Sequence, residues 1–321
     1  MAILLDILDI MSEQLGFVGL GNMGIQMSQN LQKYLTANKL PNLMAYNRTA
    51  AKGEPLQALG GVLAPSISEL VQKCSIVIFM MSTEDATADA IDQALTVDVK
   101  GKLLVSTATV SPEFARKLGE KVNGAGACYL SSPVFGMPTV AAAAQLIFAV
   151  SGKKEHFDRF EPYTKSMGKA QYYLGEDYGQ APLMKITGNT FILGLVELVG
   201  ETMAFGESAG ISSDIITRWA EDFAGPSIAK YFHKNSDGVY SPGKNGRPFF
   251  SIPNGQKDGG FAKKIADDNG ASLPIMETVL SNFAELSKRP EDNLDVSAVY
   301  GLMREKAGLD FENEAVKKRG D

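Results

Sequence analysis

One stretch near the amino terminus decides the fold: Phe17-Val18-Gly19-Leu20-Gly21-Asn22-Met23-Gly24-Ile25-Gln26-Met27. It joins an apolar run typical of a strand to a glycine-rich turn and then to residues with helical spacing. Gly19 permits the tight turn, Gly21 lets backbone N–H groups approach an anion, and Gly24 allows the helix to pack closely on the strand. The stretch therefore predicts a turn that holds the pyrophosphate of a dinucleotide at a helix amino terminus.

A motif of the form G-x-G-x-x-G is weak by itself, so its flanks matter. Upstream, Leu15, Phe17 and Val18 form a short apolar run. Downstream, apolar residues recur at helical spacing, at Met27, Leu31, Tyr34 and Leu35. Both flanks thus predict strand, turn and helix in the order that the motif requires.

Length, composition and charge bound the class of protein. With 321 residues, of which 45% are hydrophobic and 21% charged, the chain is typical of a globular protein of two domains. Its formal net charge of −6 gives no reason to expect nucleic acid or an acidic membrane as a partner. We therefore expect neither as a partner.

Cysteine and histidine are rare, with two of each. Cys74 and Cys128 lack C-x-x-C spacing, and no metal-ligand spacing surrounds His156 or His233. These residues predict a reducing, cytoplasmic compartment and no metal site.

Two apolar segments could be read as a targeting signal or a membrane span. Residues 1–11 carry Asp6 and Asp9 but no basic residue, so they fit neither a secretory signal nor a transit peptide, and we expect an extension outside the fold. The apolar stretch Phe191–Val199 is interrupted by Glu197 and is much shorter than the roughly 20 residues of a membrane span. We therefore expect a soluble protein.

From about residue 14 to 180, short apolar runs alternate with amphipathic segments. Strands are expected at 42–46, 75–80, 102–106, 127–130, 146–150 and 171–174. This alternation predicts an α/β domain, a Rossmann-type doubly wound and mostly parallel sheet with helices on both faces, spanning residues 12–181.

After residue 181 the pattern becomes helical. Helices are expected at 182–209, near 212–223, 258–269, 273–287 and 295–305, and they predict an all-α domain over 182–321 that begins with a long linking helix. The segment 225–256 is rich in Pro, Gly, Ser and Asn. It reads as an irregular excursion between helices, which could be a functional lid or ordinary surface irregularity.

The expected helix at 182–209 is apolar on every side, and glycine recurs in it every six residues, at Gly188, Gly194, Gly200 and Gly206. A step of six turns a helix by about 240°, so these glycines predict close contacts on several faces rather than one groove. A helix apolar all round should be buried, here between the two domains and against a second subunit. We expect a homodimer or homotetramer.

Cofactor choice is indicated at the end of the second expected strand, where Asn47-Arg48-Thr49 stands without an acidic residue. An acid there would take the ribose hydroxyls of NAD and repel a 2′-phosphate. Arg48 can instead pair with that phosphate through two hydrogen bonds, and Thr49 can add a hydroxyl donor. The pattern favours NADP, although a surface arginine beside an NAD site would look the same.

Hydride transfer to a carbonyl needs a proton donor for the oxygen. Lys185 and Asn189 are four residues apart on one expected helix face, so both can reach the same atom. A lone lysine on a helix is usually a solvated charge. The apolar neighbours of Lys185 argue against that reading.

With these residues the chain resembles the β-hydroxyacid dehydrogenase family, which includes 3-hydroxyisobutyrate dehydrogenases and glyoxylate and succinic semialdehyde reductases. The resemblance runs from about residue 14 over nearly the whole chain, and its nucleotide domain is of the 6-phosphogluconate dehydrogenase type. The motifs occur in the family's order: the glycine turn with Asn47-Arg48-Thr49, Ser106-Thr107, Ser132-Pro133-Val134-Phe135-Gly136-Met137, the Lys185/Asn189 helix, and Gln256-Lys257-Asp258.

The resemblance implies a role for each matching position. Lys185 would be the general acid in reduction and the base in oxidation, and Asn189 would help to hold the substrate. The implied cofactor-binding residues are Gly19, Leu20, Gly21, Asn22, Met23, Gly24, Asn47, Arg48, Thr49, Met81, Thr107 and Lys257. The implied substrate-binding residues are Ser132, Phe135, Gly136, Met137 and Asn189.

One motif departs from the family. The usual pattern is Pro-Val-Ser-Gly, whose serine helps to hold the substrate carboxylate, whereas this chain has Phe135 in that place and Met137 after Gly136. A hydroxyl donor is lost and a ring is gained, so we expect a more apolar pocket and glyoxylate to be a poorer substrate than a larger aldehyde acid. Simple core packing of Phe135 is the alternative.

Two other functions stay open. An imine reductase shares this architecture and an Asn-Arg-Ser/Thr segment but generally lacks the lysine. A non-catalytic NADP-binding scaffold, as in relatives that have replaced the lysine, is the other. The presence of Lys185 favours an NADP-dependent oxidoreductase of small aldehyde, keto or hydroxy acids over both.

Overall fold

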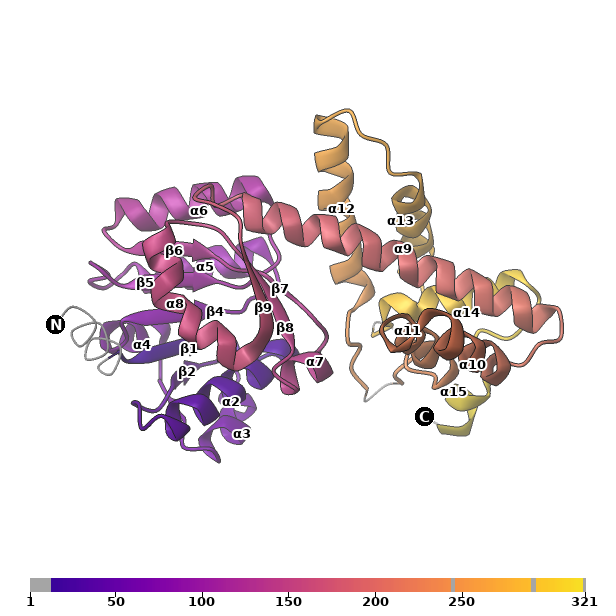
Figure 1. Ribbon diagram of the computed structural model, residues 1–321, viewed down its shortest axis with the longest axis horizontal. Helices are drawn as coiled ribbons and strands as arrows, with labels where there is room; N and C mark the ends of the chain where they lie inside the picture. Colours follow the sequence, from indigo (N-terminus) through magenta and orange to yellow (C-terminus); the bar gives the residue numbers. More distant parts are fainter. Residues whose placement is uncertain (1–12, 244–245, 290–292, 320–321) are drawn as a thin grey trace. The chain divides into compact units, whose positions relative to one another are not determined.

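The computed structural model describes residues 13–243, 246–289 and 293–319. The chain forms two compact units, residues 1–185 and 186–321, which we call the α/β unit and the helical unit (Figure 1). The extension expected at residues 1–11 lies outside the described residues.

A six-stranded parallel sheet is the centre of the α/β unit. Its strands are β1 (Leu15–Val18), β2 (Met44–Tyr46), β3 (Val62–Leu63), β4 (Ile76–Phe79), β5 (Leu103–Ser106) and β6 (Cys128–Ser131). They lie in the order β3-β2-β1-β4-β5-β6, so the chain reverses its direction of winding between β1 and β4. In such sheets ligands bind outside the carboxyl ends of the strands at this reversal.

Helices cover both faces of the sheet. They are α2 (Asn22–Ala37), α4 (Ile67–Lys73), α5 (Glu84–Ala94), α6 (Pro112–Gly124) and α8 (Lys154–Met167), with η1 (Ala50–Gly53) and α3 (Glu54–Gln57) after β2. Successive residues of β4 alternate between two cores, with Ile76 and Ile78 in one and Val77 and Phe79 in the other. Burial on both faces explains the continuous apolar runs in the sequence. The predicted Rossmann-type fold is confirmed.

Two of the expected strands belong to a separate sheet. β8 (Leu146–Val150) pairs with β9 (Gly168–Tyr173) in parallel and with β7 (Val134–Phe135) in antiparallel orientation, and α7 (Pro138–Ala142) connects β7 to β8. The sequence placed 146–150 and 171–174 in the main sheet, which is wrong. An apolar run predicts a strand, but its partner depends on contacts far away in the sequence.

The second unit is all helical, as predicted. It contains α10 (Ser213–Ala224), α11 (Pro226–Ser236), α12 (Ile252–Asp268), α13 (Pro274–Leu286), η2 (Val296–Ala298), α14 (Val299–Lys306), α15 (Glu314–Arg319) and most of α9 (Gln180–Ser208). The expected irregular excursion at 225–256 is wrong in part, because α11 occupies its first third and α12 begins within it. Pro226 stands in the first turn of α11, where a proline starts a helix rather than breaking it.

α9 makes the close contacts that its glycines predict. A Cβ on Gly200 would lie 3.1 Å from the backbone N of Tyr300, and one on Gly206 would lie 2.6 Å from Ile216. However, the helix is not buried on all sides. Phe191, Leu198 and Phe205, seven residues apart, are exposed by 64%, 61% and 73%. Seven residues are nearly two full turns, so these side chains form one apolar stripe.

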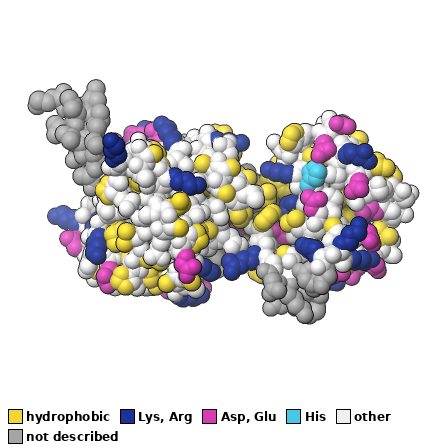
Figure 2. All heavy atoms as spheres, turned by 90° about the horizontal axis from the view of Figure 1, so that it is seen from below, with side chains coloured by type: hydrophobic (Ala, Val, Ile, Leu, Met, Phe, Trp, Pro, Cys, Tyr) yellow, Lys and Arg dark blue, Asp and Glu magenta, His cyan; other side chains and the backbone are white. Residues whose placement is uncertain are grey.

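The distribution of surface charge and the apolar character of α9 can be compared with the sequence. Figure 2 shows a face on which apolar side chains lie among charges of both signs on each unit. By length and composition α9 could cross a membrane, the one such helix in the described part of the chain. Core helices of soluble proteins pass the same test, and α9 places Leu193, Val196 and Met203 in the core of the helical unit.

Candidate active site

The glycine turn follows β1 with the geometry that its sequence predicts. Gly19 has a φ of +97°, and a Cβ there would lie 2.3 Å from the carbonyl oxygen of Met80. A Cβ on Gly24 would lie 1.9 Å from the carbonyl oxygen of Gly19. Larger residues at these two positions would collide with backbone, so both glycines are required by close approach of the chain to itself.

Gly21 differs, because a Cβ there would meet nothing within 4 Å. Gly21 caps α2 without a side-chain hydrogen bond, and the first turn of α2, which includes Asn22 and Met23, holds no acidic residue. The first N–H groups of a helix lack partners within the helix, and the helix dipole favours an anion beside them. Open space at Gly21 and an uncapped helix start fit the pyrophosphate of a dinucleotide.

Asn47 ties the glycine turn to the end of β2. Its Oδ1 accepts a hydrogen bond from Leu20 N at 2.9 Å, and its Nδ2 donates to the carbonyl oxygen of Thr49 at 2.9 Å. Arg48 and Thr49 follow on the surface. The structure therefore brings together the two segments that the sequence assigned to the cofactor, and it leaves Arg48 exposed beside them.

The ends of β4 and β5 lie next to this turn. The sulfur of Met81 would stand 3.2 Å from a Cβ on Gly19. Thr107 is 1% exposed, and its hydroxyl donates to the carbonyl oxygen of Phe79 at 3.0 Å. Met81 is thus placed against the glycine turn, whereas the Thr107 side chain packs between strands with its proton already donated.

The segment Ser132–Met137 follows β6 at the same edge of the sheet. Ser132 N donates to the carbonyl oxygen of Ser106, which ends β5, at 2.7 Å, and the Ser132 side chain is fully buried. Phe135 and Met137 are half-buried, and Gly136 has a φ of +145°. The predicted substrate segment therefore lies next to the end of β5, where the sequence places the residues near the nicotinamide. The tip of the segment carries an aromatic and a thioether side chain and no hydroxyl.

Lys185 lies against this segment. Its ammonium nitrogen is 4.6 Å from the centroid of the Phe135 ring. The start of α9 is held in place on the α/β unit, because Ser151 Oγ accepts from Ala181 N at 3.2 Å. Asp177 adds a second anchor, since it accepts from Gly179 N at 2.9 Å and forms two hydrogen bonds of 2.8 Å with Arg116.

This anchor also perturbs a carboxyl group. The Arg116 guanidinium, bonded to Asp177, holds the pKa of that carboxyl well below its usual range. Sequence reasoning missed the anchor, because an Arg and an Asp 61 residues apart give no local signal.

The helical unit contains a buried polar cluster that joins residues of two motifs predicted from the sequence. Asn189 and Asp258 are both almost fully buried, and Asn189 Nδ2 donates to Asp258 Oδ2 at 2.6 Å. Lys257 Nζ lies 2.9 Å from the other oxygen of Asp258. One carboxylate therefore fixes the amide of Asn189 and neutralises Lys257. The sequence motif includes Asp258 next to Lys257, but it gives no signal for the hydrogen bond to Asn189.

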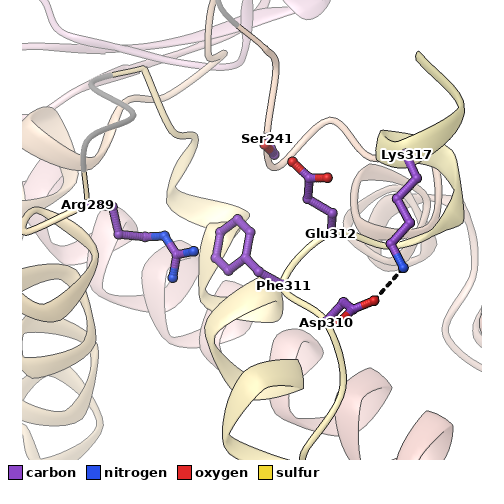
Figure 3. Close-up of a pocket in the computed structure, with 6 residues that line it drawn as sticks. All are labelled: Ser241, Arg289, Asp310, Phe311, Glu312 and Lys317. Carbon is purple, nitrogen blue, oxygen red and sulfur yellow. Dashed lines mark hydrogen bonds and ion pairs between the residues drawn. The ribbon is translucent and has the colours of Figure 1, made fainter. Parts of the chain in front are cut away.

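A shallow hollow elsewhere on the helical unit contains none of the predicted site residues. It has a volume of about 270 Å³, and its lining consists of Ser241, Arg289, Asp310, Phe311, Glu312 and Lys317. Figure 3 shows Lys317 turned toward Asp310, with which it forms an ion pair of 2.5 Å. Its charged groups are of both signs, and Arg289 pairs with Glu305 outside the lining, so the hollow presents no single-sign site for a ligand. Among the described residues, no group of three or more His, Cys, Asp or Glu is arranged to hold a metal ion.

Comparison with known proteins decides the family. Residues 14–175 match the family described as the NAD binding domain of 6-phosphogluconate dehydrogenase. Glyoxylate/succinic semialdehyde reductase 1 of Arabidopsis thaliana is 28% identical over 303 residues, which are 91% of this chain and 98% of that protein. The chain belongs to the β-hydroxyacid dehydrogenase family.

The matched proteins are not uniform in cofactor or reaction. NADH-dependent oxidoreductase ucdB of Aspergillus ustus is 29% identical over 90% of this chain and 98% of its own length. The structure of a 3-hydroxyisobutyrate dehydrogenase from Salmonella typhimurium matches with a TM-score of 0.81 at 21% identity, over 91% of this chain and all of that one. An imine reductase of Streptomyces aurantiacus matches at 0.60 and 22%, over 91% and 99%. At these identities the structural matches show the fold alone.

Family membership makes a nicotinamide dinucleotide the cofactor class, and the relatives are oxidoreductases that act on CH–OH groups. The open Gly21 position and the uncapped start of α2 fit that cofactor.

Proposed function

We propose that this chain is an NADPH-dependent reductase of small aldehyde or keto acids, which also runs in reverse as a hydroxyacid dehydrogenase. One observation carries the proposal: the Lys185 ammonium lies at the segment Ser132–Met137, beyond the carboxyl end of β6. A proton donor there stands by the sheet edge to which the glycine turn also belongs.

The proposed mechanism divides the reaction between cofactor and protein. The nicotinamide, when bound, supplies the hydride in reduction and accepts it in oxidation. Lys185 donates a proton to the carbonyl oxygen in reduction and removes the hydroxyl proton in oxidation. Asn189, one helical turn later, holds the substrate with an amide whose orientation Asp258 fixes. Lys257 forms an ion pair with Asp258, and its role toward cofactor and substrate is carried over from the family resemblance.

The proposal includes NADPH rather than NADH. It is supported by Arg48, which is exposed after β2 where an acidic residue would favour NAD. The relative from Aspergillus ustus is described as NADH-dependent, so cofactor preference has to be measured on this chain.

A steady-state panel tests the function directly. We expect NADPH oxidation with semialdehydes and keto acids, NADP reduction with β-hydroxyacids, and weaker turnover of glyoxylate than of larger aldehyde acids. Lys185→Ala should lower kcat by on the order of 10²–10⁴, the usual contribution of a positioned proton donor. Lys185→Arg is the matched control, because arginine keeps the charge but does not give up its proton.

Each outcome decides something. If Lys185→Ala turned over near the wild-type rate, the mechanism would be wrong. If Lys185→Arg kept full activity, charge alone would be needed and proton donation would not. Binding of NADPH without turnover of any carbonyl compound would support the scaffold alternative, and turnover of cyclic imines in preference to carbonyl acids would support the imine reductase.

We also propose that a second copy of the chain covers the apolar stripe of α9. The stripe consists of Phe191, Leu198 and Phe205. The same unit also exposes Trp219 and Phe223 of α10, which stack with ring centroids 5.1 Å apart. Large exposed apolar patches mark protein interfaces. Leu198→Glu with Phe205→Glu should shift the light-scattering mass toward the monomer, and Asp268→Lys on α12 should not. An unchanged mass would refute the interface. A cytoplasmic location stays a prediction from the sequence.

A further inference from the structure

Phe135 is the side chain that meets the proposed proton donor. The Lys185 ammonium is 4.6 Å from the ring centroid, within the range of a cation–π contact. Both residues belong to the α/β unit, so the contact does not depend on the placement of the helical unit.

The backbone at Phe135 is constrained on both sides. Phe135 ends the short strand β7 and is paired with Ile147 of β8 in antiparallel register. Directly after it, Gly136 adopts a φ of +145°, and a Cβ there would lie 2.5 Å from Leu146. A strand on one side and a glycine-only turn on the other fix the backbone at Phe135, and so the point from which its half-buried ring extends toward Lys185.

We propose that Phe135 is a positioning and specificity-determining residue: its ring face holds the Lys185 ammonium in place and selects substrates whose carbonyl carries an apolar neighbour rather than a directly attached carboxylate. The inference rests on the function proposed above, with Lys185 as proton donor.

Two properties of an aromatic ring support this role. The face of the ring carries negative potential, so it attracts the ammonium and limits the directions in which Nζ can point. The same face repels an anion. A carboxylate bonded directly to the reacting carbonyl would have to lie within one bond of it, close to both Lys185 and the ring, and the exposed tip of the segment offers no side-chain hydroxyl to compensate.

The substrate class follows from this geometry. A semialdehyde or keto compound with at least one methylene between carbonyl and carboxylate can place apolar atoms against Phe135 and Met137 and keep its charge away from the ring. A 2-oxo acid such as glyoxylate has its carboxylate bonded directly to the carbonyl carbon, so it cannot keep its charge away from the ring. We therefore infer an aldehyde or ketone with a spaced carboxylate, or with none, as the substrate of this site.

The first experiment separates the ring from its bulk. Phe135→Leu keeps an apolar side chain but removes the ring face, and it should lower kcat roughly 3- to 30-fold with little change in KM for a preferred semialdehyde. Phe135→Tyr restores the ring and should recover kcat to within about threefold of wild type. Tyr172→Leu, which removes an exposed ring on β9, is the matched control. Equal kcat for Phe135→Leu and wild type would overturn the positioning role.

The second experiment addresses selectivity. Phe135→Ser removes the anion-repelling face and adds a hydroxyl donor, so the ratio of kcat/KM for glyoxylate to kcat/KM for succinic semialdehyde should rise roughly tenfold or more. An unchanged ratio, with melting temperature and cofactor KM as in wild type, would mean that Phe135 only packs the core.

A readout without turnover keeps this inference separate from the proposed function. A ring face against Lys185 shields its nitrogen, so amine-directed labelling of Lys185, measured by mass spectrometry relative to the other lysines, should be faster in Phe135→Leu and unchanged in Phe135→Tyr. If wild type reduced no carbonyl compound, the proposed function would fail whatever the labelling. If wild type were active but the Phe135 variants showed the same labelling rate and the same substrate ratio as wild type, only the inference about Phe135 would fail.

Discussion

The α/β unit and the helical unit build their polar sites in opposite ways. At the glycine turn of the α/β unit, backbone groups form the site, and Gly19 and Gly24 are needed because a single added carbon would strike a carbonyl oxygen. In the helical unit, buried side chains form pairs, Asn189 with Asp258 and Lys234 with Asp295. The glycine turn is therefore disrupted by an added atom, and the buried pairs are destabilised by removal of one partner.

The largest effect is expected in the helical unit. Asp295 is fully buried and accepts from Lys234 at 2.7 Å, from the backbone N of Phe250 at 2.9 Å and from Ser297 at 2.7 Å. Asp295→Ala leaves the buried Lys234 charge without its carboxylate and should lower the free energy of unfolding by about 3–5 kcal/mol. Urea denaturation measures it.

The double variant Asp295→Leu with Lys234→Met is the control for that loss. Removing both charges leaves no buried ion, so it should cost much less than Asp295→Ala alone. A double variant as unstable as the single one would show that the hydrogen bonds to Phe250 and Ser297, rather than the unpaired charge, dominate.

The second prediction compares two glycines of one turn. Gly24→Ala places a Cβ 1.9 Å from a carbonyl oxygen and should lower the free energy of unfolding by about 3 kcal/mol. Gly21→Ala meets nothing within 4 Å and should leave stability within about 0.5 kcal/mol, while weakening nucleotide binding by occupying the anion's approach. Thermal unfolding and NADPH titration measure the two. Equal destabilisation by both would contradict the steric account.

The third prediction concerns Glu197, a buried carboxyl that is only partly hydrogen-bonded. Asn282 donates to its Oε1 at 2.5 Å, and burial raises the pKa of Glu197 to about 7. The ordinary value is 4.5, so between pH 4.5 and about 7 the unfolded chain gives up this proton while the folded chain keeps it. Stability should therefore fall as pH rises through that window, by roughly 3 kcal/mol, and level off above it.

Glu197→Gln should remove most of this slope, because an amide is neutral at every pH. Glu201→Gln, on the same helix but exposed, should keep most of it. Guanidinium unfolding at pH 4.5, 6 and 8 measures the slope, and a wild-type protein equally stable at all three values would contradict the assignment.

The smallest effect is expected at Arg48. Arg48→Ala removes the proposed partner of the 2′-phosphate and should raise KM for NADPH about tenfold, with little change in KM for NADH. Lys52→Ala, on the neighbouring exposed turn, serves as the control and should have a smaller effect. Equal changes for both cofactors would refute the preference for NADPH.

Local patterns predicted the α/β unit well where the chain decides its structure locally. The apolar run before Gly19 is β1, and the strand at 102–106 is β5 within one residue. A buried parallel strand needs only a short apolar run bounded by turn residues, and both are visible in the sequence. The strand at 146–150 was also found, but its sheet was not, because pairing is a long-range property.

The segment 225–256 shows why the helical unit was harder. α11 is polar in composition, yet it is fixed by Lys234, whose partner Asp295 is 61 residues away. At the candidate site, Lys185 and Asn189 could be singled out by their spacing and apolar surroundings. The partner of Asn189 is 69 residues distant, and the contact of Lys185 with Phe135 joins two motifs that the sequence presents separately.

Asn47 has a consequence for protein engineering. By binding Leu20 on one side and Thr49 on the other, it acts as a clip between the loop meant for the phosphates and the two exposed positions that follow it. Residues 48 and 49 can therefore be varied in a library aimed at exchanging the cofactor. The glycine turn should stay in place as long as residue 47 keeps its amide.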